Sequence, residues 1–251
     1  MTRKLFKLRN VKFVNKLIIR ARYAFNLSSS FQSEIYGNNK MKISGLNGFT
    51  LVNYPNKISC VLFAQGCPLH CKYCYNKRLL TEPLIEWQEI EDFLRKRQGS
   101  LEAVVISGGE PMLQYKELKK ASLFVKSLGY NLGLHLTGLN SDKSEFKEIV
   151  ELADWIGLDF KAPENKYKEI CGLNYNDFLR ALDIIMNLNK DFEIRTTLDK
   201  KLTKEDLLEM QQVLLNKGIN KWYLQRLMLN EGTFNIPDYD LNDFEIDIQI
   251  R

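Results

Sequence analysis

The chain has 251 residues, of which 45% are hydrophobic, enough for one medium-sized globular domain with a core. No apolar run approaches the roughly 20 residues that a membrane-spanning helix needs, so the composition predicts a soluble protein without a membrane span. The formal net charge of +5 is concentrated near the N-terminus, which leaves the middle of the chain close to neutral and argues against a nucleic-acid-binding face on the main domain.

The two ends of the chain differ in charge from the middle. Residues 1–33 hold eight Lys or Arg and no acidic residue, whereas residues 231–251 hold six acidic residues and one Arg. A regular alternation of apolar runs begins only at Met41. We therefore expect three parts: a poorly ordered, dispensable basic extension over residues 1–40, a folded domain over residues 41–230 and an acidic tail over residues 231–251. The basic extension also has the composition of a transit peptide.

Strand-like and helix-like runs alternate from the start of the expected domain. The expected strands are residues 58–63, 103–107, 131–136, 155–160, 192–197 and 221–226. The expected helices are residues 87–97, 114–128, 144–152, 176–188 and 203–216. Six strands that alternate with helices predict an α/β fold with a parallel sheet and right-handed crossovers. In such folds the chemistry lies at the carboxyl ends of the strands.

Three cysteines follow the first of these strands within eight residues. Cys67, Cys71 and Cys74 have the spacing C-x3-C-x2-C, in a loop that Gly66 and Pro68 introduce. A short loop can bring three thiolates around one object at little entropic cost. Two objects are plausible, an iron–sulfur cluster or a zinc ion, and a set of unligated thiols is the third reading.

The supply of ligands favours the cluster over zinc. A closed zinc site takes four Cys or His ligands, commonly as paired C-x2-C motifs. The remaining cysteines, Cys60 and Cys171, are isolated, and we expect them to belong to the core. Five cysteines with this distribution do not form a secreted disulfide framework and suit a reducing cytoplasm, where we expect the protein to reside.

Polar and glycine residues that are unusual for a core follow the other strands. In chain order they are Ser107, Gly108, Gly109, Glu110 and Pro111, then His135 and Thr137, then Asp159 and Lys161, then Arg195 with Thr196 and Thr197, and finally Gln225 and Arg226. The two adjacent glycines allow a backbone to approach a ligand closely, and an arginine on an interior strand needs an anionic partner. A satisfied core histidine is the ordinary explanation of His135, and an exposed ion pair is that of Asp159 and Lys161.

The cysteine spacing and the aromatic Tyr73 before the last cysteine resemble the signature of radical S-adenosylmethionine (SAM) enzymes. The order of the Gly108-Gly109-Glu110-Pro111, His135-Leu136-Thr137-Gly138, Asp159–Pro163 and Arg195–Thr197 runs is similar to that in the activating enzymes of this group, above all the anaerobic ribonucleoside-triphosphate reductase activating family. The resemblance covers about residues 41–230. One departure is Tyr75, where the family often has histidine.

This resemblance implies a fold and a set of roles. The fold would be an incomplete (β/α)6 barrel of the TIM type, and the metal ligands of a [4Fe–4S] cluster would be Cys67, Cys71 and Cys74. The expected contacts of SAM are Tyr73 against the adenine, Gly108, Gly109 and Glu110 at the methionine amino group, Lys161 and Arg195 with Asp159 at the methionine end, and His135 and Thr137 on the ribose side.

The resemblance also implies a reaction and partners. The enzyme would reductively cleave SAM and install a glycyl radical on a partner enzyme, most simply anaerobic ribonucleotide reductase, with a low-potential donor such as flavodoxin or ferredoxin. A small-molecule radical SAM enzyme of the 7-deazaguanine synthase type, an activase of another glycyl radical enzyme, and an electron-transfer or zinc module without catalysis remain alternatives. A barrel that stops at six strands should stay open on one side, which suits a protein substrate.

Overall fold

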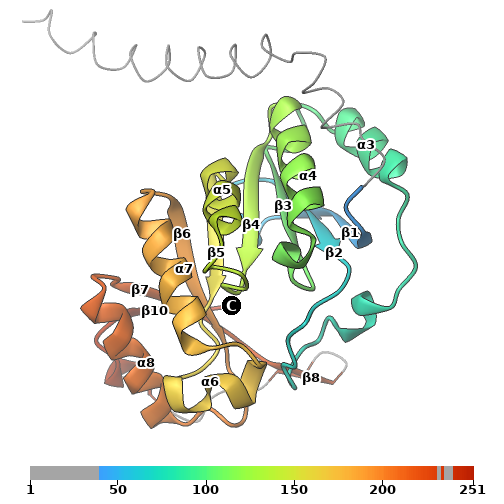
Figure 1. Ribbon diagram of the computed structural model, residues 1–251. Helices are drawn as coiled ribbons and strands as arrows, with labels where there is room; N and C mark the ends of the chain where they lie inside the picture. The colour runs from blue at the N-terminus through green and yellow to red at the C-terminus, as the bar shows by residue number, and fades with distance from the viewer. Residues whose placement is uncertain (1–39, 231–232, 235–239) are drawn as a thin grey trace, which may run out of the picture.

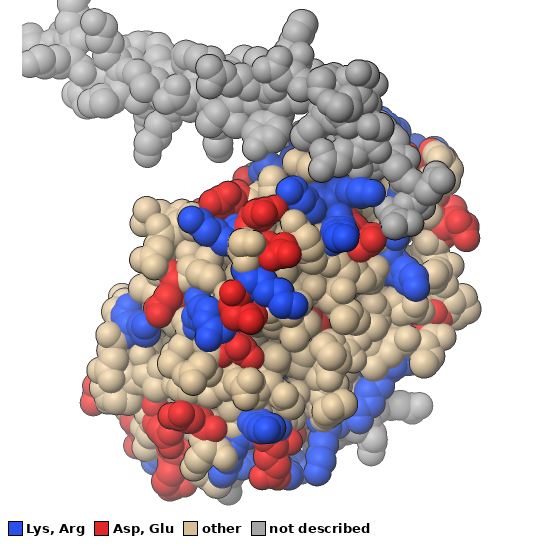
Figure 2. All heavy atoms as spheres, in the orientation of Figure 1, with Lys and Arg blue, Asp and Glu red and all other residues tan. Residues whose placement is uncertain are grey.

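The computed structural model describes residues 40–230, 233–234 and 240–251, so all but the last residue of the expected basic extension lies outside the described part. Within these ranges no helix is long and apolar enough to cross a membrane. Basic and acidic side chains are interspersed over the face of the molecule shown in Figure 2, so no patch of a single sign dominates that face.

One curved sheet of eight strands organises the described chain (Figure 1). In spatial order the strands are β1 (Ile43–Thr50), β2 (Ser59–Ala64), β3 (Ala103–Gly108), β4 (Asn131–Leu136), β5 (Trp155–Asp159), β6 (Asp191–Thr197), β7 (Lys221–Gln225) and β10 (Asp247–Ile250). β1 pairs antiparallel with β2, and every other neighbouring pair is parallel. A separate ribbon pairs β8 (Met228–Asn230) with β9 (Thr233–Phe234).

The helices form the crossovers between the parallel strands, and Figure 1 shows α4, α5, α7 and α8 packed along one face of the sheet. The helices are α3 (Trp87–Lys96), α4 (Tyr115–Ser127), α5 (Ser144–Leu152), α6 (Glu164–Cys171), α7 (Tyr175–Asn187) and α8 (Lys204–Asn216), with short 3-10 turns η1 (Lys77–Leu80), η2 (Pro111–Gln114) and η3 (Leu241–Asp243). The start of α8 is fixed by a capping box in which Thr203 and Asp206 exchange side-chain and backbone hydrogen bonds.

The two faces of the sheet pack differently. Alternate strand residues such as Leu62, Ile106 and Leu134 face the helices and belong to the large core. The opposite, inner face carries a small separate cluster of Tyr54, Val61, Ala103, Val105 and Trp155. On the inner face, apolar side chains therefore fill the part near the amino ends of the strands, and polar groups lie at the carboxyl ends.

The six expected strands and five expected helices are all confirmed, each within one residue of its expected bounds. The α/β fold with an incomplete barrel is confirmed as well, because β1 and β10 are the outermost strands of the sheet and do not pair with each other. The sequence reading missed the 3-10 turns, the β8–β9 ribbon, β1, α6 and, at the end of the chain, β10.

The last of these corrects the expectation for the acidic tail. Residues 247–250 pair in parallel register with residues 221–224 of β7, so this end of residues 231–251 is part of the main sheet and not an appendage. The backbone of Arg251 continues the pairing by donating to the carbonyl of Leu224 and accepting from the N–H of Arg226, each at 2.9 Å.

Candidate active site

A cavity of about 220 Å³ lies at the carboxyl ends of the parallel strands. The cysteine loop after β2 forms one wall, and residues from the ends of β3 to β7 form the rest. The lining includes Cys67, Cys71, Tyr73, Cys74, Gly108, Gly109, His135, Thr137, Asp159, Lys161 and Arg195. Eleven of the twelve metal ligands and SAM contacts predicted from the sequence thus line one cavity, and Glu110 is the exception.

Backbone hydrogen bonds hold the cysteine loop against two other elements. The N–H of His70 donates to the carbonyl of Cys171 at the end of α6, over 3.0 Å. The N–H of Glu110 donates to the carbonyl of Gly66 over 2.9 Å, and the N–H of Gly109 donates to Ala64 over 2.8 Å. The loop is therefore fastened before Cys67 to the segment that follows β3, and between Cys67 and Cys71 to the end of α6.

The three thiols have the chemistry that an iron–sulfur cluster requires. Cys67, Cys71 and Cys74 are partly buried free thiols. Burial raises the pKa of Cys67 to about 11 and raises that of Cys71, so both favour the thiol form until a metal centre takes up the thiolate. In the described part of the chain no three Cys, His, Asp or Glu side chains converge as ligands of one metal ion would. Thiolates that each bind a different iron of a cluster need no such convergence, so the donor set fits a cluster.

The adjacent glycines after β3 serve the cysteine loop directly. A Cβ on Gly109 would lie 1.9 Å from the carbonyl oxygen of Gly66, and a Cβ on Gly108 would lie 2.4 Å from the backbone nitrogen of Ala64. Gly108 also has a φ of 112°, which L side chains rarely adopt. Both glycines line the cavity, but the close approach that requires them is to the backbone of the cysteine loop.

Glu110 does not line the cavity. Its side chain is fully buried, with Oε1 accepting from the N–H of Met112 at 3.0 Å and Oε2 accepting from the N–H of Thr137 at 3.2 Å and from the Thr137 hydroxyl. Burial raises the pKa of Glu110 to about 7, although these donors favour the carboxylate. In this structure Glu110 caps η2 and ties the end of β3 to the end of β4.

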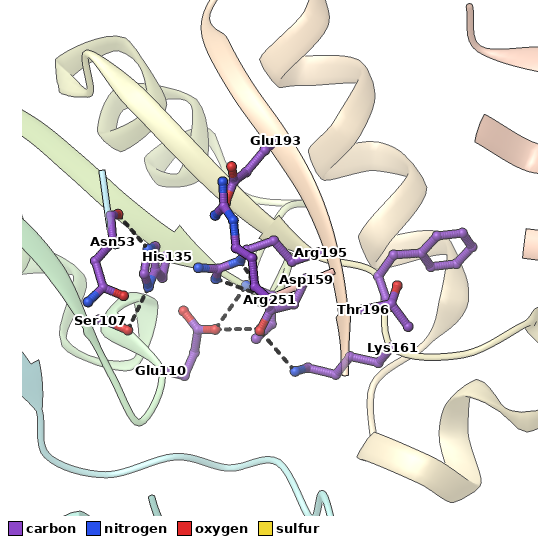
Figure 3. Close-up of polar contacts among 12 residues, drawn as sticks. Asn53, Ser107, Glu110, His135, Asp159, Lys161, Glu193, Arg195, Thr196 and Arg251 are labelled. Atoms are coloured by element: carbon purple, nitrogen blue, oxygen red, sulfur yellow. Dashed lines mark hydrogen bonds and ion pairs between the residues drawn. The ribbon is translucent and has the colours of Figure 1, made fainter. Parts of the chain in front are cut away.

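Three charged residues that line the cavity, Asp159, Lys161 and Arg195, form a triad (Figure 3). Asp159 accepts from Arg195 Nη2 at 2.7 Å and Nε at 3.1 Å through Oδ1, and from Lys161 Nζ at 3.1 Å through Oδ2. Burial alone would raise the pKa of Asp159, but the charges of Lys161 and Arg195 outweigh it and bring the pKa to about 2. Gly157 makes room for this arrangement, because a Cβ there would lie 2.8 Å from the guanidinium carbon of Arg195.

His135 is held on the inner face between two neighbours, as Figure 3 shows. Its Nδ1 lies 2.9 Å from the Ser107 hydroxyl and its Nε2 lies 3.3 Å from the carbonyl oxygen of Asn53. Burial lowers the pKa of His135 well below its usual value, and the positive charge of Arg195 adds to the effect. His135 is therefore a neutral imidazole at physiological pH.

Tyr73 and the two cysteines outside the motif, Cys60 and Cys171, have different surroundings. The ring of Tyr73 packs against the core, with Lys161 Nζ 5.9 Å from its centroid. Cys60 and Cys171 are fully buried in the core and do not line the cavity. Burial raises their pKa values to about 12 and about 11.

Sequence reasoning gave no role to several residues that line the same cavity: Asn53, Tyr75, Asn76, Ser107, Thr197 and Gln225. The sequence marks Thr197 as a strand-end residue, and it could have been assigned to the cavity because it lies two residues after Arg195 and so on the same face of a strand. Asn53 could not have been assigned to the cavity, since it belongs to the turn between β1 and β2 and not to the carboxyl end of a parallel strand.

Comparisons with known proteins identify the family of this chain. The family model described as the radical SAM superfamily matches residues 61–214. A Methanocaldococcus jannaschii protein named as a candidate glycyl-radical enzyme activating enzyme is 29% identical over 68% of this chain and 73% of its own length. The pyruvate formate-lyase-activating enzyme of Clostridium pasteurianum is 28% identical over 81% of this chain and 90% of its own. The crystal structure of Streptococcus suis SuiB bound to S-adenosylmethionine shares the fold, with a TM-score of 0.55 and 16% identity over 74% of this chain and 48% of that one.

Proposed function

The chain belongs to the radical SAM superfamily, and from that premise we propose that it is an activase that generates a glycyl radical on a partner enzyme. The superfamily uses a [4Fe–4S] cluster and SAM, and the two relatives described above, at 29% and 28% identity, carry activating-enzyme names. The partner that the order of motifs favours is anaerobic ribonucleotide reductase. The electron would come from a low-potential carrier of the flavodoxin or ferredoxin kind, in the reducing cytoplasm that clustered thiols require.

The cluster ligands in this proposal are Cys67, Cys71 and Cys74, each from the loop fastened between α6 and β3. When bound, the cluster and SAM supply the one-electron chemistry, and the protein binds, orients and excludes water. Lys161 and Arg195 suit the methionine carboxylate of SAM because both are cations held in the cavity beside the cysteines. Tyr73 provides an aromatic ring between the last two cysteines for the adenine.

Of the remaining predicted SAM contacts, four line the cavity, and Glu110 lies behind one of them. Gly108 and Gly109 would offer backbone carbonyls to the methionine amino group, since both line the cavity and the N–H of Gly109 already donates to Ala64. His135 and Thr137 also line the cavity, and we assign them to the ribose side of SAM. Glu110 acts through Thr137: its carboxylate fixes the Thr137 backbone and hydroxyl, so it positions this wall of the cavity.

The observation that carries the proposal is that three thiols share one cavity with the Asp159–Lys161–Arg195 triad. A radical SAM site needs an open-sided thiolate cluster beside a polar pocket for the cofactor, and the described residues supply both. An ordinary core would not leave two buried cations next to partly buried thiols.

The test begins with anaerobic reconstitution. We expect roughly four irons per chain, and 5′-deoxyadenosine formation from SAM with dithionite. Cys71→Ala should abolish both, whereas the matched change Cys60→Ala should abolish neither, because Cys60 is a buried core residue outside the cavity. Equal iron content in the two variants would contradict the cluster assignment.

The partner is tested by EPR. The reduced, SAM-loaded protein is mixed with candidate glycyl radical enzymes, including anaerobic ribonucleotide reductase, and a glycyl doublet should appear on one of them and require all three cysteines. Modification of a small metabolite with turnover, and no radical on any of these enzymes, would replace the activase with a small-molecule radical SAM enzyme.

A further inference from the structure

The wall of the cavity formed by β6 and β7 carries an uncharged polar pair. Thr197 is the last residue of β6 and Gln225 is the last residue of β7. The two are register partners on neighbouring parallel strands, and both line the cavity. Thr197 lies on the same strand face as Arg195, two residues away. The hydroxyl and the amide therefore stand side by side at the mouth of the barrel.

The fold does not use these two side chains for itself. Among the described residues, neither the Thr197 hydroxyl nor the Gln225 amide has a hydrogen-bond partner, whereas the adjacent Thr196 hydroxyl donates to the carbonyl of Phe160 at 2.6 Å and accepts from the indole of Trp222 at 3.0 Å. Figure 3 shows Thr196 and Arg195 on opposite sides of their strand. The hydroxyl of Thr197 is thus available to a ligand, whereas the hydroxyl of Thr196 is used by the fold.

The other partly or fully buried glutamines near the sheet follow the pattern of Thr196. Gln65 donates to the carbonyl of Glu82 at 2.8 Å, and Gln114 donates to the carbonyl of Gln65 at 2.9 Å. Gln211 accepts from the N–H of Glu245 at 2.9 Å. Each of these side-chain amides pairs with a backbone group, which shows what such an amide does when a backbone is within reach. Gln225 presents the same donor and acceptor to the cavity.

The Thr197–Gln225 pair offers hydrogen bonds to a ligand but no charge. The one carboxylate in the cavity, Asp159, is already paired with Lys161 and Arg195, and the Thr197–Gln225 pair has no charge of its own. A side-chain amide with one donor and one acceptor matches a main-chain amide, and a hydroxyl adds a further donor for a carbonyl. An extended peptide presents these groups without any charge.

We propose that Thr197 and Gln225 form a subsite for the peptide main chain of the protein substrate, next to the residue that reacts. The inference rests on the proposed function, and it names what the substrate must offer. Gln225 accepts from one backbone N–H and donates to one backbone carbonyl, and Thr197 donates to a carbonyl beside them. Recognition of main-chain atoms places a glycine in the cavity without contacts to side chains.

The experiment measures peptide binding, not turnover. Reconstituted protein with SAM and no reductant is equilibrated in anaerobic dialysis with radiolabelled N-acetyl-Ala-Gly-Ala-methylamide. A second probe has an ester in place of the Gly–Ala amide and so lacks that N–H. Gln225→Leu should raise the Kd of the amide peptide about tenfold, the effect of losing two neutral hydrogen bonds. The Kd of the ester should rise by less, because one of the two bonds is already missing from it.

A matched control is available on the neighbouring strand. Gln249 is exposed on β10, donates to Asp247 at 2.8 Å and lies outside the cavity lining, so Gln249→Leu should leave the Kd of both probes unchanged. Thr197→Val should raise the Kd of the amide peptide about fivefold, the effect of one hydrogen bond. The urea midpoint of each variant checks that the fold is intact.

Two results would overturn the subsite: equal Kd values of wild type and Gln225→Leu for the amide peptide, or no binding of either probe to the wild type at millimolar concentration. Neither result touches the proposed function, which fails separately if the wild type gains no cluster or forms no 5′-deoxyadenosine.

Discussion

Replacing Asp159 by asparagine tests the electrostatic centre of the site. The change keeps the size of the side chain and removes the carboxylate that forms ion pairs with both Lys161 and Arg195. These two cations are 9% and 7% exposed, and Asp159 is 27% exposed, so water screens the triad only partly. We expect the variant to leave two cations close together without a counter-charge.

The pKa of Asp159 gives the magnitude. A fall from 3.8 to about 2 on folding corresponds to about 2 kcal/mol of stability at neutral pH. Because the folded-state pKa is depressed, this contribution is fully present above pH 4 to 5 and is lost as the pH falls through the folded pKa. About half of it should remain at pH 3. Asp159→Asn should therefore lower the unfolding free energy by about 2 kcal/mol at pH 7 and by about half as much at pH 3.

Urea unfolding of the cluster-free protein at pH 7, 5 and 3 measures these values, with an unchanged m-value as the check on two-state behaviour. The control is Asp183→Asn, which removes a salt bridge to Lys217 between side chains that are 48% and 33% exposed. It should cost less than about 1 kcal/mol. A loss at Asp159 no larger than at Asp183, or one that does not shrink between pH 5 and pH 3, would refute the electrostatic account of the triad.

Three further changes test other parts of the site. Gly109→Ala should destabilise the fold by about 3 kcal/mol or more and prevent iron uptake, because its Cβ would overlap the carbonyl of Gly66; normal iron content would contradict this. The double variant Cys60→Ala/Cys171→Ala should keep its iron, measured per chain after reconstitution, and loss of most of it would make one of them a ligand. Glu110→Gln should flatten the pH dependence of the urea midpoint: the raised pKa of Glu110 makes the wild type lose stability as the pH rises from 4.5 to about 7, and glutamine does not titrate. An unchanged slope would refute the burial argument.

The sequence sufficed for the six parallel strands because each is an apolar run bounded by glycine or polar residues and followed by a helical repeat. It failed where local preference is weak and tertiary pairing decides. β1 contains Gly45, Asn47 and Gly48, which disfavour strands, and it forms by pairing with β2. β10 has four residues inside an acidic segment and is added to the edge of β7.

The sequence likewise predicted most residues of the site but not the direction of every side chain. The cavity brings together the residues that strand ends and cysteine spacing single out, since parallel strands deliver their carboxyl ends to one edge. Glu110 could not be placed, because its direction depends on the N–H groups of Met112 and Thr137, which no linear pattern relates to it. Gln225 stood out in the sequence only as a polar strand end, and its lack of a partner among the described residues is a property of the packing.

Eight strands would be enough to close a TIM barrel, yet this sheet stays open. The reason lies in its edges: β1 runs antiparallel to β2, and β10 extends the opposite edge beyond β7 without reaching β1. A TIM barrel closes by pairing its first and last parallel strands, and here an antiparallel strand occupies one of the two edges. The openness expected from six strands therefore survives the addition of two. An open barrel leaves the cavity accessible to a loop of another protein, whose own surface would have to exclude water once the loop is in place. The uncharged wall of Thr197 and Gln225 is where such a loop could be held by its main chain alone.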